Sequence, residues 1–284
     1  MLCTNDKGDI VKVLVTGHRG FIGQNLVKYI QDNTDWEVDG WEWTDKSFPT
    51  VQGYNWVVHL GAISSTTEQD VEKILYQNTE FSKMLFRACQ INFVNFQYSS
   101  SASVYGLQSD FKESSKCVPQ NPYAWSKYLF ERWVSKQGLS YNCTAHGFRY
   151  FNVYGNYEDH KGSQASPVTQ FRKQNPIKLF YGSENYLRDF IAVEDICRVH
   201  VDFIRKVKQP GIWNIGTGRT RSFQDIADVV SRINNTPIDY IEMPEILKSS
   251  YQKYTCADLT KLEDSIGTQR WITVEEWLDK YMIN

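Results

Sequence analysis

Three residues in the middle of the chain could together move a proton to or from an alcohol oxygen. Tyr123 and Lys127 form a Tyr-x-x-x-Lys pattern, and Ser101 stands upstream of it. If Tyr123 opens a helix, the tyrosine and the lysine lie at i and i+4 and share one face. A lysine ammonium near a phenol, joined by the positive charge of an oxidised nicotinamide, lowers a pKa that is ordinarily about 10. The pattern indicates hydride transfer at an alcohol carbon, with Tyr123 taking the proton and Ser101 holding the oxygen.

The Tyr-x-x-x-Lys pattern carries little weight alone, because a second one occurs at Tyr157 and Lys161. An ordinary amphipathic helix explains the first pattern equally well. The sequence around it therefore has to decide between the two interpretations.

Composition excludes several classes of protein. The 284 residues are enough for one large domain and a smaller lobe, and 31 basic against 33 acidic residues argue against a nucleic-acid or anionic-membrane partner. The six cysteines and five histidines are scattered, so reduced thiols and no metal site are predicted. The chain has neither a signal peptide nor an apolar run of about 18 residues, which predicts a cytoplasmic protein.

A glycine-rich turn follows the first predicted strand. Residues 11–16 are typical of a short buried strand, Gly17-His-Arg-Gly20-Phe-Ile-Gly23 comes next, and 25–30 begin a helical pattern. The glycines allow a tight turn and a close approach of the backbone to a pyrophosphate at the helix N-terminus. This arrangement predicts a nicotinamide dinucleotide site.

The choice between NAD and NADP depends on two residues that favour opposite answers. Glu42 stands near the end of the next predicted strand, 36–43, where an acid usually holds the ribose hydroxyls of NAD. Arg19 inside the glycine turn could instead bind a 2′-phosphate, as could Lys46.

The first half of the chain alternates strands and helices. Strand 55–60 ends at Gly61-Ala62, a helix is expected over 70–90, and strand 93–98 runs into a serine-rich segment that contains Ser101. The hydroxyls of 64–67 either meet the nucleotide or cap the helix. This alternation predicts an α/β fold with a Rossmann-like, doubly wound parallel sheet, whose carboxyl strand ends open onto one crevice.

The second half is expected to return to this sheet once and to form a smaller α/β substrate lobe. Strands are predicted at 148–155 and 212–218, whereas 159–166 has the composition of a surface loop. Ser222 with Asp225, and Thr273 with Glu276, are typical of helix capping boxes. We therefore expect an NAD(P)-binding domain of residues 1–152 plus 187–217 and a substrate lobe of residues 153–186 plus 218–284.

The glycine turn, Ser101, Tyr123 and Lys127 together resemble the extended short-chain dehydrogenases that act on nucleotide sugars. Further segments resemble the ADP-glycero-manno-heptose 6-epimerase family over nearly the whole chain. These segments are Gly61–Glu68, Tyr150–Gly155, His160–Ser163, Lys178–Phe180, Gly182–Asn185, Arg188–Phe190, Asn214–Gly218 and Ala257–Thr260.

The resemblance implies an epimerase that oxidises C-6″ of a heptose and returns the hydride to the other face, with NADP, or NAD as the alternative, bound throughout. It makes Lys161 a second acid/base beside Ser101, Tyr123 and Lys127. The residues expected at the cofactor are Gly17, Arg19, Gly20, Phe21, Ile22, Gly23, Glu42, Leu60, Gly61, Ala62, Ser64, Asn78, Tyr123, Lys127, Val153 and Lys161. Those expected at the nucleotide-sugar substrate are Asn152, Ser163, Gln170, Phe180, Tyr181, Gly182, Ser183, Arg188 and Tyr251. A homo-oligomer is expected.

Three departures from the family leave alternatives open. The stretch between Glu42 and Trp56 is shorter than in the family, Gln170 replaces a histidine, and Ser250 replaces an arginine. A 4-epimerase, which would leave Lys161 idle, is the main alternative, followed by a sugar-nucleotide reductase and a non-catalytic NAD(P)-binding module. A 4,6-dehydratase is disfavoured because Ala102 and Ser103 stand where it needs an acid pair.

Overall fold

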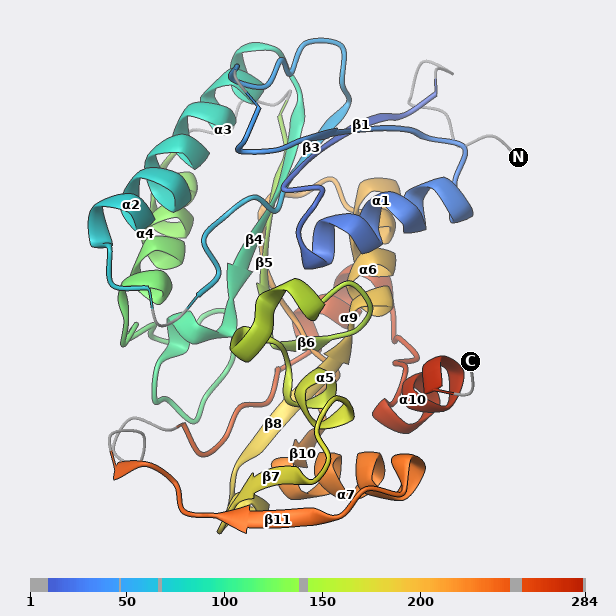
Figure 1. The fold of residues 1–284 in the computed structure, drawn as a ribbon. Helices are drawn as coiled ribbons and strands as arrows, with labels where there is room; N and C mark the ends of the chain where they lie inside the picture. Colours follow the sequence, from blue (N-terminus) through green and yellow to red (C-terminus); the bar gives the residue numbers. More distant parts are fainter. Residues whose placement is uncertain (1–9, 46, 66–67, 138–142, 246–251, 283–284) are drawn as a thin grey trace.

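A six-stranded, all-parallel sheet forms the larger part of the protein (Figure 1). The computed structural model describes residues 10–45, 47–65, 68–137, 143–245 and 252–282. The strands stand in the order β2 (Glu37–Trp41), β1 (Lys12–Thr16), β3 (Trp56–His59), β4 (Asn95–Ser101), β5 (Ala145–Tyr150) and β9 (Gly211–Ile215). From β1 the chain passes to β2 on one side and then to β3 on the other, so the strand order reverses between β1 and β3. Sheets of this kind bind ligands in the crevice at such a reversal. The predicted Rossmann-like α/β fold is confirmed.

Helices cover both faces of this sheet, because alternate strand residues point to opposite sides. Val13 and Val15 of β1 pack under α1 (Phe21–Asn33) and α6 (Val193–Lys206). Leu14, between them, packs in a separate cluster under α3 (Phe81–Ile91) and α4 (Pro122–Lys136). Figure 1 shows the two helix layers on either side of the sheet. Burial on both faces explains why the central strands β1 and β3 consist largely of consecutive apolar residues.

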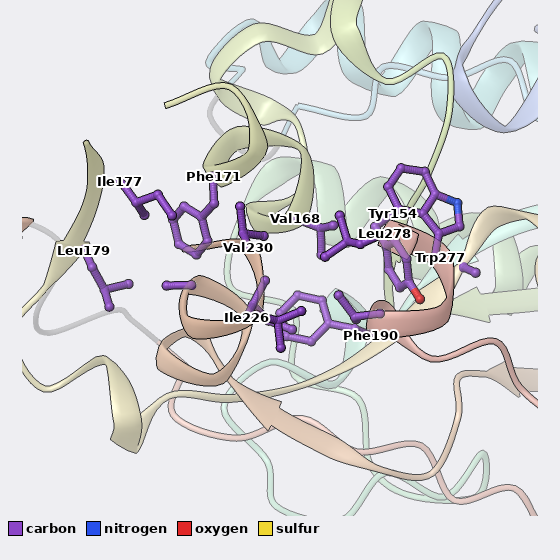
Figure 2. Close-up of a cluster of buried hydrophobic side chains, with 14 residues drawn as sticks. Tyr154, Val168, Phe171, Ile177, Leu179, Phe190, Ile226, Val230, Trp277 and Leu278 are labelled. Atoms are coloured by element: carbon purple, nitrogen blue, oxygen red, sulfur yellow. The ribbon is translucent and has the colours of Figure 1, made fainter. Parts of the chain in front are cut away.

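The smaller part lies beyond the carboxyl ends of the large sheet and has its own core (Figure 1). Its strands are β6 (Asn152–Tyr154), β8 (Leu187–Ala192) and β10 (Thr220–Ser222) in one sheet, and β7 (Ile177–Phe180) with β11 (Ile238–Ile241) in another. Its helices are α5 (Pro167–Arg172), α7 (Phe223–Asn234) and α10 (Val274–Met282), and α9 (Thr260–Ile266) returns to the β9 edge. Figure 2 shows side chains of α5, α7 and α10 meeting in one cluster around Val168, Val230 and Trp277.

Most predicted elements are present, and two expectations are wrong. The expected helix over 70–90 is present as α2 (Val71–Leu75), a π-helical turn η1 (Tyr76–Glu80) and α3. Its N-terminal cap is Asp70, whose side chain accepts a hydrogen bond from the Lys73 amide, and not the hydroxyls expected upstream. Residues 159–166 are not an irregular loop, because Asp159–Gln164 form the 3₁₀ segment η3. Both capping boxes are confirmed.

The short connection between β2 and β3 is also as expected, since the residues described there contain no helix or strand. None of the described helices combines the length and the apolar composition needed to cross a bilayer.

Three histidines are buried in the large domain in their neutral form. Burial lowers the pKa of His59, His146 and His200 to about 3 in each case. His59 and His200 are hydrogen-bonded between elements, to Thr16 and Ser82 and to Gln97 and Tyr150 respectively.

Acidification is expected to destabilise the protein. Below about pH 6.5, the ordinary histidine pKa, the unfolded chain binds more protons than the folded chain, so stability falls as pH falls. From about pH 7 to about pH 5 we expect a loss on the order of 1 kcal/mol or more for each histidine. The free energy of unfolding, obtained from guanidinium denaturation at both pH values, measures this loss. The variant His146→Phe, which fits the aromatic contacts with Trp56, Phe203 and Trp213, should lose part of this dependence, and an unchanged dependence would contradict the assignment.

Candidate active site

The glycine turn brings three backbone segments into contact at the switch point of the sheet. A Cβ atom on Gly23 would lie 2.1 Å from the Gly17 carbonyl oxygen, and one on Gly17 would lie 2.6 Å from Gly61 Cα. Gly17 also has a φ of 73°, which other residues rarely adopt. Gly20 caps α1 without a side-chain hydrogen bond, so the first-turn amides are available to an anion. This cradle fits the pyrophosphate of a dinucleotide.

Gly23→Ala is expected to weaken dinucleotide binding by about 1–3 kcal/mol, because relieving the overlap requires a strained backbone. Dinucleotide released from the purified variant, together with titration of added cofactor, measures the loss. Gly53→Ala is the control, since it strains the backbone at a φ of 91° but has open space around it and lies on a turn outside the cavity. Equal affinity in the Gly23 variant and the wild type would contradict the cradle.

A cavity of about 220 Å³ opens in front of this turn. It joins residues from α1, β3, β4, α4, β5 and η3. Its lining residues are Gly17, Gly20, Phe21, Ile22, Gly23, Leu60, Ala62, Ser64, Ser99, Ser100, Tyr123, Lys127, Tyr150, His160 and Lys161. Of these, Ser99, Ser100, Tyr150 and His160 were not predicted, although the serines directly precede Ser101 and His160 directly precedes Lys161.

Tyr123 sits in the first turn of α4, which is fixed by Pro122 and by the Asn121 side chain accepting from the Ala124 amide. Burial raises the pKa of Tyr123, and a hydrogen bond with Ser101 partly opposes this rise. The lowered pKa expected from the sequence is therefore wrong for the protein alone, because burial outweighs the other contributions. The cation that would reverse this balance is the oxidised nicotinamide.

Lys127 lies one turn further along α4, with its ammonium 5.9 Å from the centre of the Tyr123 ring. It donates to the Ser99 carbonyl at 3.0 Å and to Ser99 Oγ at 3.1 Å. Burial lowers the pKa of Lys127 to about 8, and the carboxylate of Glu131 opposes this. Glu131 is itself buried and binds Arg149 Nη2 at 2.7 Å and Ser100 Oγ at 2.5 Å. Two turns of α4 thus carry the tyrosine, the lysine and a carboxylate that favours the charged lysine.

Asn78 was expected at the cofactor but lies buried behind it in the π-helical turn. Its side chain accepts from the Ile63 amide at 2.8 Å and donates to the Ile63 carbonyl at 2.9 Å and to Ser126 Oγ at 3.0 Å. Asn78 therefore fixes the segment after β3 against α4.

The side chain of Glu42 contacts the backbone of Arg19 and of Trp43. The Arg19 amide donates to Glu42 Oε2 at 3.2 Å, and the Trp43 amide donates to Glu42 Oε1 at 3.0 Å. Glu42 is thus held beside the glycine turn, at the end of β2.

Lys161 reaches the cofactor cavity from the 3₁₀ segment η3. The segment turns sharply at Gly162, whose φ is 54°. The Lys161 ammonium lies 5.4 Å from the centre of the Phe21 ring, and its Nζ lies 3.6 Å from Glu158 Oε1. Two sequence-distant lysines and one tyrosine therefore share one cavity.

Some residues expected at the substrate line a second cavity, of about 260 Å³, between α5, β7 and β11. Gln170, Phe180 and Ser183 contribute to it. Gln170 Nε2 donates to the Ala165 carbonyl at 2.6 Å and to the Ser163 carbonyl at 3.2 Å, so Gln170 also fixes the segment after η3.

The other expected substrate residues are more dispersed. Tyr181 is exposed and stacks on Tyr240, and Gly182 turns into the 3₁₀ segment η4 (Ser183–Asn185). Arg188 is buried, donating to the Leu187 and Gln252 carbonyls. Asn152 and Val153 lie in β6, and Tyr251 is outside the described residues.

A larger cavity, of about 770 Å³, lies elsewhere, between α4 and α9. It contains none of the predicted site residues, and several of its charged side chains have partners within the protein. Lys261 donates to the Ile212 carbonyl and Glu131 binds Arg149. Its size therefore does not make it the reactive site.

A glycine turn at the switch point, with Ser101 at the carboxyl end of β4 and Tyr123 and Lys127 on α4, defines a Rossmann-type nicotinamide dinucleotide enzyme. Residues 13–216 match the sequence model of the NAD dependent epimerase/dehydratase family. The chain belongs to this family, which confirms the resemblance to extended short-chain dehydrogenases.

Solved structures share the fold at low sequence identity. ADP-L-glycero-D-manno-heptose-6-epimerase from Helicobacter pylori has a TM-score of 0.83 and 23% identity, with 96% of each chain covered. UDP-glucose 4-epimerase from Thermus thermophilus, in complex with NAD, has a TM-score of 0.78 and 23% identity, covering 96% of this chain and 99% of that one. RMD from Pseudomonas aeruginosa, complexed with NADPH, has a TM-score of 0.79 and 20% identity, with 95% of each chain covered. At these identities the likeness concerns the fold.

Proposed function

We propose that the protein is a nucleotide-sugar epimerase of the ADP-glycero-manno-heptose 6-epimerase type. The observation that carries this proposal is the presence of Lys161 in the same cavity as Tyr123 and Lys127. In an epimerase of this type the reacting oxygen points to different sides in the two epimers, so a proton-transfer group is needed on each side. Tyr123 and Lys161 come from different elements and supply two such groups.

The protein's part in the reaction is proton transfer and orientation. A bound nicotinamide dinucleotide supplies the hydride acceptor and donor. Tyr123, hydrogen-bonded to Ser101, takes the hydroxyl proton of one epimer as the C–H bond breaks, and the substrate becomes a ketone. The ketone turns over, and Lys161 protonates the oxygen of the other epimer when the hydride returns. No net oxidation results.

We infer that the second cavity holds the nucleotide end of the substrate. It has aromatic side chains in Phe171, Phe180 and Phe223, which suit a flat base. The segment from Glu158 to Gln170 joins it to the cofactor cavity, so one substrate could occupy both.

A UDP-sugar 4-epimerase is the second candidate. It is favoured by the equally full coverage of the Thermus thermophilus enzyme and by the replacement of a family histidine with Gln170. A 4-epimerase gives no role to Lys161, so the effect of a Lys161 substitution on the rate separates the two candidates.

The resident cofactor is expected to be NAD, although the family resemblance favours NADP. Glu42 is held beside the glycine turn with both oxygens toward backbone amides. A carboxylate there would bind ribose hydroxyls and repel a 2′-phosphate. Identification of the dinucleotide released from denatured protein tests this, and NADP alone would contradict it.

Proton NMR of ADP-D-glycero-manno-heptose incubated with the purified protein tests the reaction. We expect interconversion at C-6″ without added cofactor, because the dinucleotide is restored in each turnover. A UDP-glucose incubation in parallel tests the 4-epimerase. Conversion of UDP-glucose alone would overturn the heptose assignment.

Tyr123→Phe is expected to lower the rate of epimerisation by roughly 10²–10⁴, the usual contribution of a general acid/base. Lys161→Met should cause a comparable loss in the 6-epimerase and little change in a 4-epimerase. Lys173→Met is the matched control, since Lys173 pairs with exposed Asp159. A Tyr123→Phe variant of wild-type rate would remove the tyrosine from the chemistry.

We further propose that two copies associate through α2, α3 and α4, which pack side by side (Figure 1). These helices expose large apolar side chains, namely Val71, Leu75, Tyr76, Met84, Trp125 and Leu129. Such a patch is unusual on a monomer. Light scattering should give a dimer for the wild type and a monomer for Leu129→Glu, and a monomeric wild type would contradict the proposal.

A further inference from the structure

Glu158 is a buried carboxylate at the start of η3, with 1% of its surface exposed. Its Oε1 accepts from the Ser166 amide at 2.6 Å, and its Oε2 accepts from Ser166 Oγ at 2.7 Å and from Thr169 Oγ1 at 2.8 Å. A carboxylate has about four acceptor positions, and these bonds fill three. They fasten η3 to the N-terminus of α5.

Lys161 forms an ion pair with the same carboxylate, at a distance longer than a hydrogen bond. Its Nζ lies 3.6 Å from Glu158 Oε1, and the same ammonium faces the Phe21 ring in the first turn of α1. The lysine therefore spans the distance between a buried anion and the cofactor turn. A long flexible side chain loses much of its rotamer freedom when its charged end is held between two such groups.

The other titratable groups in the cavity do not replace Glu158. Tyr123 and Lys127 come from α4, Tyr150 from β5 and His160 from η3 itself. Lys127 is a cation and would repel Lys161. Among the described residues, the ion pair of Lys161 is with Glu158, whereas neighbouring Asp159 pairs with Lys173 on the outer surface.

We propose that Glu158 is a positioning residue, whose buried carboxylate holds the Lys161 ammonium at the cofactor cavity for proton transfer to the substrate oxygen. This inference rests on the proposed function, which gives Lys161 its acid/base role. In the transfer an N–H bond of Lys161 breaks, its electron pair stays on nitrogen, and an O–H bond forms on the substrate. Because Glu158 also anchors α5, whose Gln170 and Phe171 line the second cavity, it ties the lysine to the substrate-binding wall.

Amine rescue tests this role. In Lys161→Ala, added ethylamine should restore part of the epimerisation, because its ammonium can bind Glu158 in place of the lysine. In Lys161→Ala with Glu158→Gln, rescue should be lost, while in Lys161→Ala with Asp159→Asn it should persist. Rescue of equal size in both double variants would overturn the proposal.

The single variant Glu158→Gln separates charge from structure. Glutamine keeps the size of the side chain and can still bond to Ser166 and Thr169, but it removes the anion. We expect kcat to fall roughly 10- to 100-fold, the cost of a misplaced catalytic group, with KM changed little. Thr169→Val removes a hydrogen bond to Glu158 and keeps the charge, so it should lower the melting temperature while kcat changes comparatively little. A purely structural role would lower melting temperature and kcat together in both variants.

Two further outcomes are distinguishable. If Glu158→Gln fails to fold, Glu158→Asp in the Lys161→Ala background keeps the charge at shorter reach, and ethylamine should rescue it less well. Equal or absent rescue there would count against the proposal. If Lys161→Ala alone has the wild-type rate, the two-base function itself fails, independently of Glu158.

Discussion

The structure depends on a backbone-to-backbone contact between the ends of β1 and β3. Gly17, Gly23 and Gly61 approach each other so closely that a single Cβ atom would separate them. This contact lets α1 begin directly at the edge of the sheet, with its amides toward the cavity. Every other feature of the site is arranged around that opening, because the strand order reverses there and leaves a crevice.

The two lysines of the cavity are supported in a similar way. Lys127 has Glu131 one turn further along α4, and Lys161 has Glu158 three residues before it. Each glutamate is buried and satisfied by other donors, Arg149 and Ser100 for Glu131 and Ser166 and Thr169 for Glu158. A carboxylate beside a buried ammonium offsets part of the cost of removing that ammonium from water. The protein can thereby place two cations in one small cavity.

The connection between the two cavities has consequences for specificity. Tyr123 and Lys127 lie in the large domain, whereas the segment from Glu158 to Gln170 carries Lys161 and one wall of the second cavity. If the second cavity holds the nucleotide end, as proposed, binding there can contribute to placing the reacting groups.

The sequence by itself determined the fold class, the glycine turn and the pairing of Tyr123 with Lys127. These depend on local spacing, since a strand, a turn and a helix are each encoded in a few consecutive residues. It did not determine the 3₁₀ form of 159–164 or the place of Asn78. Those features depend on partners in other elements. Glu158 at the start of η3 binds Ser166 and Thr169 at the start of α5, and Asn78 binds Ile63 and Ser126.

The ionisation of Tyr123 was likewise decided by tertiary structure. The residues alone predicted a lowered pKa from a neighbouring cation, but burial by the surrounding elements raises it. Composition indicated a surface loop for Lys161 and the family resemblance implied a place beside Tyr123, whereas the folded chain shows Lys161 lining the cavity of Tyr123 with Glu158 buried next to it. Spacing along the chain encodes local geometry, whereas desolvation and contacts between distant segments arise only when the elements pack together.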